Sequence, residues 1–483
     1  MVSMSELLLR GVRRGVGGDL ADVRLSGDRV VAITPPGEPA GAAEVLDADG
    51  GTLLPGLVDA HVHTVQWAAA RRRIPLEGAR SAAEAVDLVA AHPCGPGELV
   101  TGAGFRDGLW PDVPHKDLLE RALPGQPVAL FSGDLHALWL SPAALKLVGR
   151  EQHPTGVLLE NDCMSATAEL PVASRETQDR WVAEALEAAA ARGVTGIADY
   201  EYTDTIADWT RRLAATPPPI RVDCVIARFA LDLAISRGLR TGDVVPDSGG
   251  LLTVGPLKVF VDGSLNTRTA YCHDPYPGSP SFGLLETPPA ELVPLLRKAW
   301  ENGISPAVHA IGDHANTIAL DAFAEVGCPG RIEHAQLLRA EDLARFAELG
   351  VIASVQPAQQ PDDRDVADRY WASRTARAFP YGALLAAGAR LEIGSDAPVA
   401  PLDPWDGIAS AVSRTDDDRP AWHPEQAIPL ADTLSAAARG RSGVRAGDVA
   451  DLVITAEDPA ESADLRAMPI RATIMGGKVT FRS

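Results

Sequence analysis

The feature that most constrains the fold is a series of eight short apolar segments, each separated from the next by a longer stretch of the chain, several of them helix-like. Strands that alternate with helices pair in parallel, and eight such units are the number that closes a (β/α)8 barrel. We therefore predict an α/β fold built on a TIM-like barrel. Its predicted strands are residues 56–61, 194–199, 220–226, 257–261, 306–309, 331–334, 351–355 and 391–393.

The two ends of the chain carry a different pattern, in which short apolar runs are separated by Gly, Asp and Pro. Such runs are typical of strands joined by tight turns. We predict that residues 1–54 and 440–483 together form a small β-sandwich and that residues 55–439 form the barrel. The interval after the first barrel strand is longer than one crossover helix requires, which predicts an α/β insertion subdomain, residues 68–173, over the barrel mouth.

The charge of the chain argues against polyanionic partners. The 483 residues include 65 acidic and 44 basic side chains, a net charge of -21. This balance repels nucleic acid and anionic membranes, although it is also typical of a solvated surface that promotes solubility. The five cysteines include no Cys-x-x-Cys pair and read as reduced cytoplasmic thiols. We expect a cytoplasmic protein with a small-molecule substrate, no nucleic acid and no membrane, and leave a homodimer open.

Ionisable side chains recur where the predicted barrel strands end. A polar group facing a barrel core is costly, so this recurrence at one edge indicates a function. Side chains alternate along a strand, so a His-x-His pair places both imidazoles on one face, where they can bind one cation. We therefore predict a metal site at this edge. Its candidate ligands are His61, His63, Lys258, His309, His334 and Asp396.

Five motifs, in order along the chain, resemble those of the amidohydrolase superfamily. Within it, the chain is most similar to the amidohydrolase 3 group, the YtcJ-like metal-dependent hydrolases related to N-substituted formamide deformylases. A tripeptide, Arg268-Thr269-Ala270, and the segments 134–139 and 400–404 also resemble that group. The five motifs are Pro55-Gly56-Leu57-Val58-Asp59-Ala60-His61-Val62-His63, Lys258 to Ser264, Val308 to Asp313, Arg331 to Gln336 and Gly394 to Val399.

The resemblance implies a role for each candidate ligand. His61, His63 and Asp396 would hold the more buried of two divalent metals, Zn²⁺ by analogy. The remaining histidines, His309 and His334, would hold the more exposed one. An unmodified ammonium repels a cation, so the resemblance implies that Lys258 is N-carboxylated and bridges the two metals.

The resemblance also implies a reaction. Two divalent ions about 3.5 to 4 Å apart lower the pKa of a shared water and supply a hydroxide at neutral pH. Asp396 would act as general base towards this water and then as general acid towards the leaving nitrogen. The expected activity is a metal-dependent amidohydrolase that cleaves an amide-like carbon-nitrogen bond, other than a peptide bond, in a small molecule.

Substrate contacts are the less specific part of the prediction. Aromatic side chains more often pack in a core than line a pocket, and a histidine or aspartate in a loop often only holds the loop. As an alternative, Lys258 could be a surface lysine or form a salt bridge with the nearby Asp262. The candidate substrate-binding residues are His136, Trp67, Phe105, Asp313 and Arg268.

Two other functions compete with the binuclear hydrolase. A mononuclear deaminase of the same superfamily usually has a glutamate three residues after the fifth-strand histidine, where this chain has Gly312. A catalytically silent barrel scaffold would lack part of the ligand set. The chain also departs from the group pattern at Leu135 and His314. These departures leave open whether the bond cleaved belongs to an amide, an ester, a cyclic urea or a carbamate.

Overall fold

The computed structural model describes residues 6–92, 94–95, 97–133, 135 and 137–483. The chain forms two compact units: the first contains Met1–Thr64 and Ala183–Ser483, and the second contains Val65–Val182. Within the described part of the chain, no helix is both long enough and apolar enough to cross a membrane.

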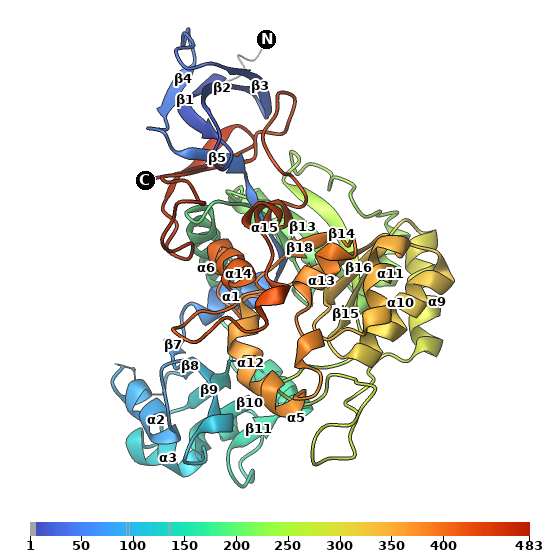
Figure 1. Cartoon of the computed structure of the whole chain (residues 1–483). Helices are drawn as coiled ribbons and strands as arrows, with labels where there is room; N and C mark the ends of the chain where they lie inside the picture. Colours follow the sequence, from blue (N-terminus) through green and yellow to red (C-terminus); the bar gives the residue numbers. More distant parts are fainter. Residues whose placement is uncertain (1–5, 93, 96, 134, 136) are drawn as a thin grey trace. The chain divides into compact units, whose positions relative to one another are not determined.

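A parallel sheet of eight strands forms the centre of the first unit (Figure 1). Neighbouring strands are all hydrogen-bonded in parallel, in the order β18-β17-β16-β15-β14-β13-β12-β6. The strands are β6 (Leu57–Val62), β12 (Val194–Asp199), β13 (Arg221–Ala227), β14 (Leu252–Phe260), β15 (Pro306–Ala310), β16 (Gly330–His334), β17 (Val351–Val355) and β18 (Leu391–Ile393).

Backbone hydrogen bonds between the two edge strands bring this sheet close to a closed barrel. The N–H of Asp396 donates to the carbonyl of His61 at 2.7 Å, and the N–H of His63 donates to the carbonyl of Ala397 at 2.9 Å. Each predicted barrel strand coincides with an observed one to within a few residues, apart from β14, which begins five residues early. The predicted TIM-like α/β fold is therefore confirmed.

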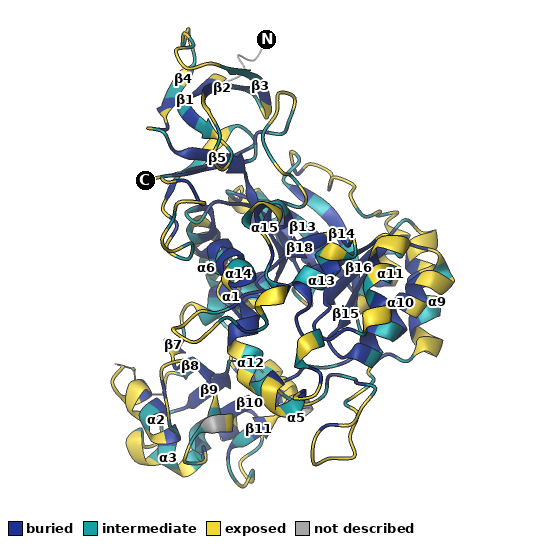
Figure 2. Ribbon diagram, in the orientation of Figure 1, coloured by how far each residue is buried: buried dark blue, intermediate teal, exposed yellow. Residues whose placement is uncertain are grey.

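Helices follow the barrel strands, as the alternating pattern requires. Their outward faces are exposed and their inward faces buried (Figure 2). They are α6 (Arg175–Ala190), which runs from the second unit into the first, α7 (Thr205–Ala215), α8 (Leu231–Ser236), α9 (Pro289–Glu301), α10 (Asp313–Val326), α11 (Leu343–Leu349), α12 (Gln359–Tyr370), α13 (Tyr381–Ala386), α14 (Pro404–Ser413) and α15 (Leu430–Ala437).

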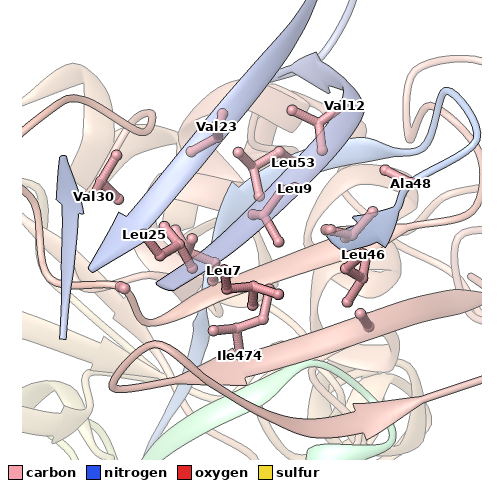
Figure 3. Packing of buried hydrophobic residues seen from close by; sticks show 14 residues of the cluster. Leu7, Leu9, Val12, Val23, Leu25, Val30, Leu46, Ala48, Leu53 and Ile474 are labelled. Atoms are coloured by element: carbon pink, nitrogen blue, oxygen red, sulfur yellow. The ribbon is translucent and has the colours of Figure 1, made fainter. Parts of the chain in front are cut away.

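Both chain ends contribute strands to a second sheet of the same unit. Strand β5 pairs antiparallel with β19, and a cluster of buried aliphatic side chains, including Leu9, Leu25 and Ile474, packs against this sheet (Figure 3). The described strands form one hydrogen-bonded network, so the sandwich arrangement stays a prediction. The strands are β1 (Glu6–Arg14), β2 (Leu20–Ser26), β3 (Arg29–Thr34), β4 (Glu44–Asp47), β5 (Thr52–Pro55), β19 (Leu452–Thr455), β20 (Ile470–Met475) and β21 (Lys478–Arg482).

The second unit has its own five-stranded sheet and its own apolar core. It spans Val65–Val182, close to the predicted insertion, whose placement over the barrel mouth stays a prediction. Its strands are β7 (Ile74–Pro75), β8 (Val100–Phe105), β9 (Val128–Ser132), β10 (Ala137–Leu140) and β11 (Val157–Leu159). Its helices are α1 (Thr64–Ala70), α2 (Ala82–Ala90), α3 (Lys116–Ala122), α4 (Pro142–Leu147) and α5 (Glu160–Glu169).

Candidate metal centre

Three predicted ligands meet where strands β6 and β18 end. Because side chains alternate along β6, His61 and His63 face the same side. Their Nε2 atoms lie 3.5 Å and 3.4 Å from Oδ1 of Asp396, and the ligand atoms of the three residues all lie within 4.8 Å of one another. Two imidazoles and a carboxylate at this spacing are a donor set that divalent cations bind.

The other two histidines adjoin this group from β15 and β16. The ring centroids of His309 and His334 lie 4.4 Å apart, and those of His61 and His334 lie 5.5 Å apart. Nε2 of His309 lies 3.3 Å from the carbonyl oxygen of Gly263, which holds a proton on that nitrogen. Among the described residues, Nδ1 of His309 and of His334 is buried without a hydrogen-bond partner. Buried unpaired imidazole nitrogens are rare and fit coordination to a cation.

Lys258 is buried inside the same group. Its Nζ lies 3.4 Å from Nε2 of His61 and over the rings of Tyr200 and Phe260, 4.8 Å and 4.7 Å from their centroids. No ion pair joins it to a carboxylate within the described ranges. The alternative partner, Asp262, instead accepts hydrogen bonds from backbone N–H groups. Burial lowers the pKa of Lys258 to about 8, so a neutral amine is accessible near neutral pH.

The electrostatics of the group distinguish three neutral imidazoles, those of His61, His309 and His334, from an ionised carboxylate. His63 differs from these three, because burial would lower its pKa but Asp396 raises it. Burial lowers the pKa of His61 to about 4 and that of His334 to about 3, and it depresses the pKa of His309 strongly. Burial alone would raise the pKa of Asp396, but the adjacent histidines hold it well below its usual value. Metal ions require deprotonated ligands, so this charge state matches the donor set.

Two of the candidate ligands have left-handed backbone conformations. The φ angle is 76° at His334 and 57° at Asp396, values that cost non-glycine residues free energy. On a regular strand His334 would point away from the face that carries Glu333, because successive side chains alternate. The left-handed turn at the end of β16 redirects the chain at His334, whose ring lies beside His61 and His309.

Glu333, to which we assign no role from the sequence, connects the group to a buried network. Its Oε2 lies 2.7 Å from Nδ1 of His61. Its Oε1 accepts hydrogen bonds from the hydroxyl of Tyr200 at 2.7 Å and from Nε of Arg331 at 2.5 Å. Burial would raise the pKa of Glu333, but Arg331 and His61 hold it far below its usual value. An ionised Glu333 keeps the proton of His61 on Nδ1 and leaves Nε2 free for a metal.

Two further polar residues fix Asp396 and His61. Oδ1 of Asp59 accepts the backbone N–H of His61 and that of Ser395, both at 3.0 Å. Nε2 of Gln359, the first residue of α12, donates to Oδ2 of Asp396 at 3.2 Å. The sequence contained a signal for both acidic residues, because each is a charged residue within an apolar strand. Asp59 lies two positions before His61, and Glu333 lies one position before His334.

Two of the predicted substrate-binding residues lie in the barrel unit. Asp313 begins α10, is buried, and accepts the backbone N–H of His273 at 2.9 Å. Arg268 is exposed on the loop after β14, and its guanidinium lies 5.5 Å from the ring centroid of Tyr370. The local bonds of Asp313 account for its burial, and the role of either residue with substrate stays a prediction.

Two of the other three, Phe105 and Trp67, lie in the second unit. Phe105 is fully buried in an apolar cluster, with its ring centroid 5.8 Å from that of Trp110 and 6.3 Å from that of Trp139. Trp67 lies in α1, is 5% exposed and packs under the guanidinium of Arg71. Packing therefore accounts for both rings, and their contact with substrate stays a prediction. His136 lies outside the described residues.

Gly312 stands where a deaminase of this superfamily would carry an acid. A Cβ atom built on Gly312 would collide with the backbone carbonyl of Tyr271. The N–H of Gly312 also donates to Asp262 at 2.8 Å, which fixes the backbone there. A side chain at this position would therefore force the backbone near Tyr271 to shift.

Comparisons with known proteins agree with this arrangement. A family model described as "Amidohydrolase family" matches residues 44–481. The YtcJ protein of Bacillus subtilis (strain 168) is 26% identical over 91% of this chain and 90% of its own. An N-substituted formamide deformylase of Arthrobacter pascens is 26% identical over 95% and 94%. The solved structure of an uncharacterized metal-dependent hydrolase from Pyrococcus horikoshii OT3 has a TM-score of 0.81 at 24% identity, covering 96% of this chain and 100% of its own.

Proposed function

Because the chain belongs to the amidohydrolase family, we propose that it is a metal-dependent hydrolase that cleaves an amide-like carbon-nitrogen bond in a small molecule. The observation that carries the proposal is the group of histidines around an ionised aspartate at the carboxyl edge of the barrel. This edge is where barrel enzymes place their active sites. The name of the deformylase relative, which acts on a carbon-nitrogen bond, supports the choice of bond.

The residues of the group divide between two cation positions. His61, His63 and Asp396 would hold one divalent metal, which the short distances from Nε2 of both histidines to Asp396 support. His309 and His334, each with an unpartnered Nδ1, would hold the second. When bound, a divalent cation lowers the pKa of a coordinated water and polarises the scissile carbonyl.

Lys258, once N-carboxylated, would add an anionic ligand to the site. Its neutral amine can attack carbon dioxide, forming an N–C bond and releasing a proton, to give an N-carboxylate. This change replaces a cation that repels metals with an anion that binds them. The burial of Lys258 without a carboxylate partner among the described residues supports this assignment.

Asp396 would transfer the proton. Oδ1 lies towards His61 and His63, and the amide of Gln359 holds Oδ2, so the carboxylate has a fixed orientation. As the general base it would accept a proton from the attacking water, and as the general acid it would return that proton to the leaving nitrogen. Its low pKa keeps it ionised and ready to accept at neutral pH.

Turnover by the metal-loaded enzyme tests this proposal. The enzyme is supplied with Zn²⁺ or Mn²⁺ and assayed on N-formyl amines, N-acyl amino acids, cyclic ureas and carbamates. Asp396→Asn should lower turnover by about a thousandfold. The matched control Asp321→Asn, an exposed carboxylate on α10 that pairs with Arg345, should retain it. Failure to hydrolyse any class, or full activity in Asp396→Asn, would refute the proposal.

A further inference from the structure

Two aromatic side chains lie exposed at the carboxyl edge of the barrel. Tyr202 follows β12 and Phe229 follows β13, and they are 54% and 60% exposed. Their rings meet edge to face, with centroids 5.1 Å apart. Aromatic surface held in water at a functional edge is unfavourable, and a patch of this kind indicates a place where another apolar group binds.

The chain itself fixes this pair close to the candidate metal centre. The ring of Tyr200 stacks on His61 with centroids 3.8 Å apart, and the N–H of Tyr200 donates to the carbonyl of Val62 at 2.7 Å. Tyr202 is two residues further on, so its Cα lies at most about 7 Å from that of Tyr200. Strands β12 and β13 are hydrogen-bonded neighbours, which brings Phe229 to the same edge.

The charges around the pair favour an uncharged ligand. Glu201 lies between Tyr200 and Tyr202 in the chain and adds a negative charge to this segment. Arg228, beside Phe229, donates to Thr287 at 3.2 Å and to Glu291 at 3.0 Å, so its charge is already paired. An apolar surface flanked in this way fits a neutral ring better than an acidic group.

We infer that Tyr202 and Phe229 form a platform that binds an uncharged aromatic substituent of the substrate, next to the bond that is cleaved. The inference rests on the proposed function for the nature of that bond and for the metal that the test ligands chelate. Binding to the platform can be measured without turnover, so the two proposals can fail separately.

The test uses two hydroxamic acids, which chelate metals and differ by one phenyl ring. Calorimetry gives the Kd of acetohydroxamic acid and of phenylacetohydroxamic acid for the Zn²⁺-loaded enzyme. The phenyl compound should bind about tenfold more tightly because its ring is buried on the platform. Tyr202→Ala and Phe229→Ala should each lower this preference about threefold. The double variant should abolish the preference, with the Kd of acetohydroxamic acid unchanged.

Two control variants separate the platform from a general effect. Tyr202→Phe keeps the ring and should keep the preference. Trp300→Ala removes another exposed aromatic side chain, 38% exposed in the last turn of α9, and should also keep it.

Two results would overturn the inference on its own: equal binding of both compounds by the wild type, and a preference that survives in the double variant. If the preference survives and the double variant has a lower melting temperature than the wild type, the two rings contribute to packing and not to binding. Binding of neither compound would refute the metal site of the proposed function and, with it, the platform that is defined relative to that site. A normal preference without turnover on any substrate class would refute the proposed function and leave the platform standing.

Discussion

The Glu333→Gln substitution replaces one oxygen of a buried carboxylate with an amide nitrogen and removes its charge. In the protein, Oε1 accepts from Tyr200 and Arg331, and Oε2 accepts from Nδ1 of His61. The single oxygen of glutamine would stay with the two donors, so its NH₂ group would face His61. Nδ1 would then have to accept, which moves the ring proton to Nε2, the nitrogen that lies beside Asp396.

The magnitude follows from these contacts. Loss of a group that orients a metal ligand lowers metal affinity about 10- to 100-fold, or roughly 1.4 to 2.7 kcal/mol. Arg331 keeps its ion pair with Glu392 at 3.0 Å but loses the charge of Glu333. Breaking a buried pair costs about 3 kcal/mol of folding free energy. Metal affinity and stability should therefore both fall.

A matched variant separates the two effects. Glu392→Gln removes the other carboxylate of the same network, which pairs with Arg331 and with Arg390. It should lower stability in urea unfolding but leave the Zn²⁺ affinity, measured against a chromophoric chelator, unchanged. An equal loss of affinity in both variants, or no loss in Glu333→Gln, would refute the tautomer argument.

Three further predictions follow from the same site. Incubation with ¹³C-labelled bicarbonate should give a carbamate ¹³C NMR signal that is absent in Lys258→Ala, and no signal in the wild type would exclude the N-carboxylate. Gly312→Ala should cost about 3 kcal/mol because its Cβ meets the carbonyl of Tyr271, whereas Gly108→Ala, with open space around it, should be nearly neutral in chemical unfolding. The metal-free protein should lose stability as pH falls from about 6.5 to about 4. In this range His61 becomes protonated in the unfolded chain but stays neutral in the folded protein, where its pKa is about 4. A free energy of unfolding that does not change with pH, or a pH dependence that His61→Asn leaves unchanged, would contradict this.

The barrel could be predicted because its signal is local and repeated. Each strand is a short apolar run, and the alternation of strand and helix fixes parallel pairing. The candidate ligands could be placed together for the same reason: the carboxyl ends of parallel strands share one edge, so His61, His334 and Asp396 meet although they lie far apart in the chain.

The rest depends on contacts that no single segment encodes. Glu333 reads as one charged residue in an apolar strand, and its role appears only once β6 and β16 bring it to His61. The left-handed backbone of His334 could likewise not be predicted from the sequence, because a residue other than glycine adopts this conformation only uncommonly. For Phe105 the sequence indicated a function where the structure shows packing. Its aromatic side chain is of a type that often binds substrates, but it lies in a buried apolar cluster.

The left-handed conformations of His334 and Asp396 have a consequence for the evolution of this chain. At both positions glycine would relax the backbone, so a mutation that destroys the site also relieves strain. Stability alone then favours loss of the ligands, and only selection for turnover opposes it. In descendants that are no longer selected for activity, we expect these two positions to be among the first to change, giving barrels that are more stable but inactive.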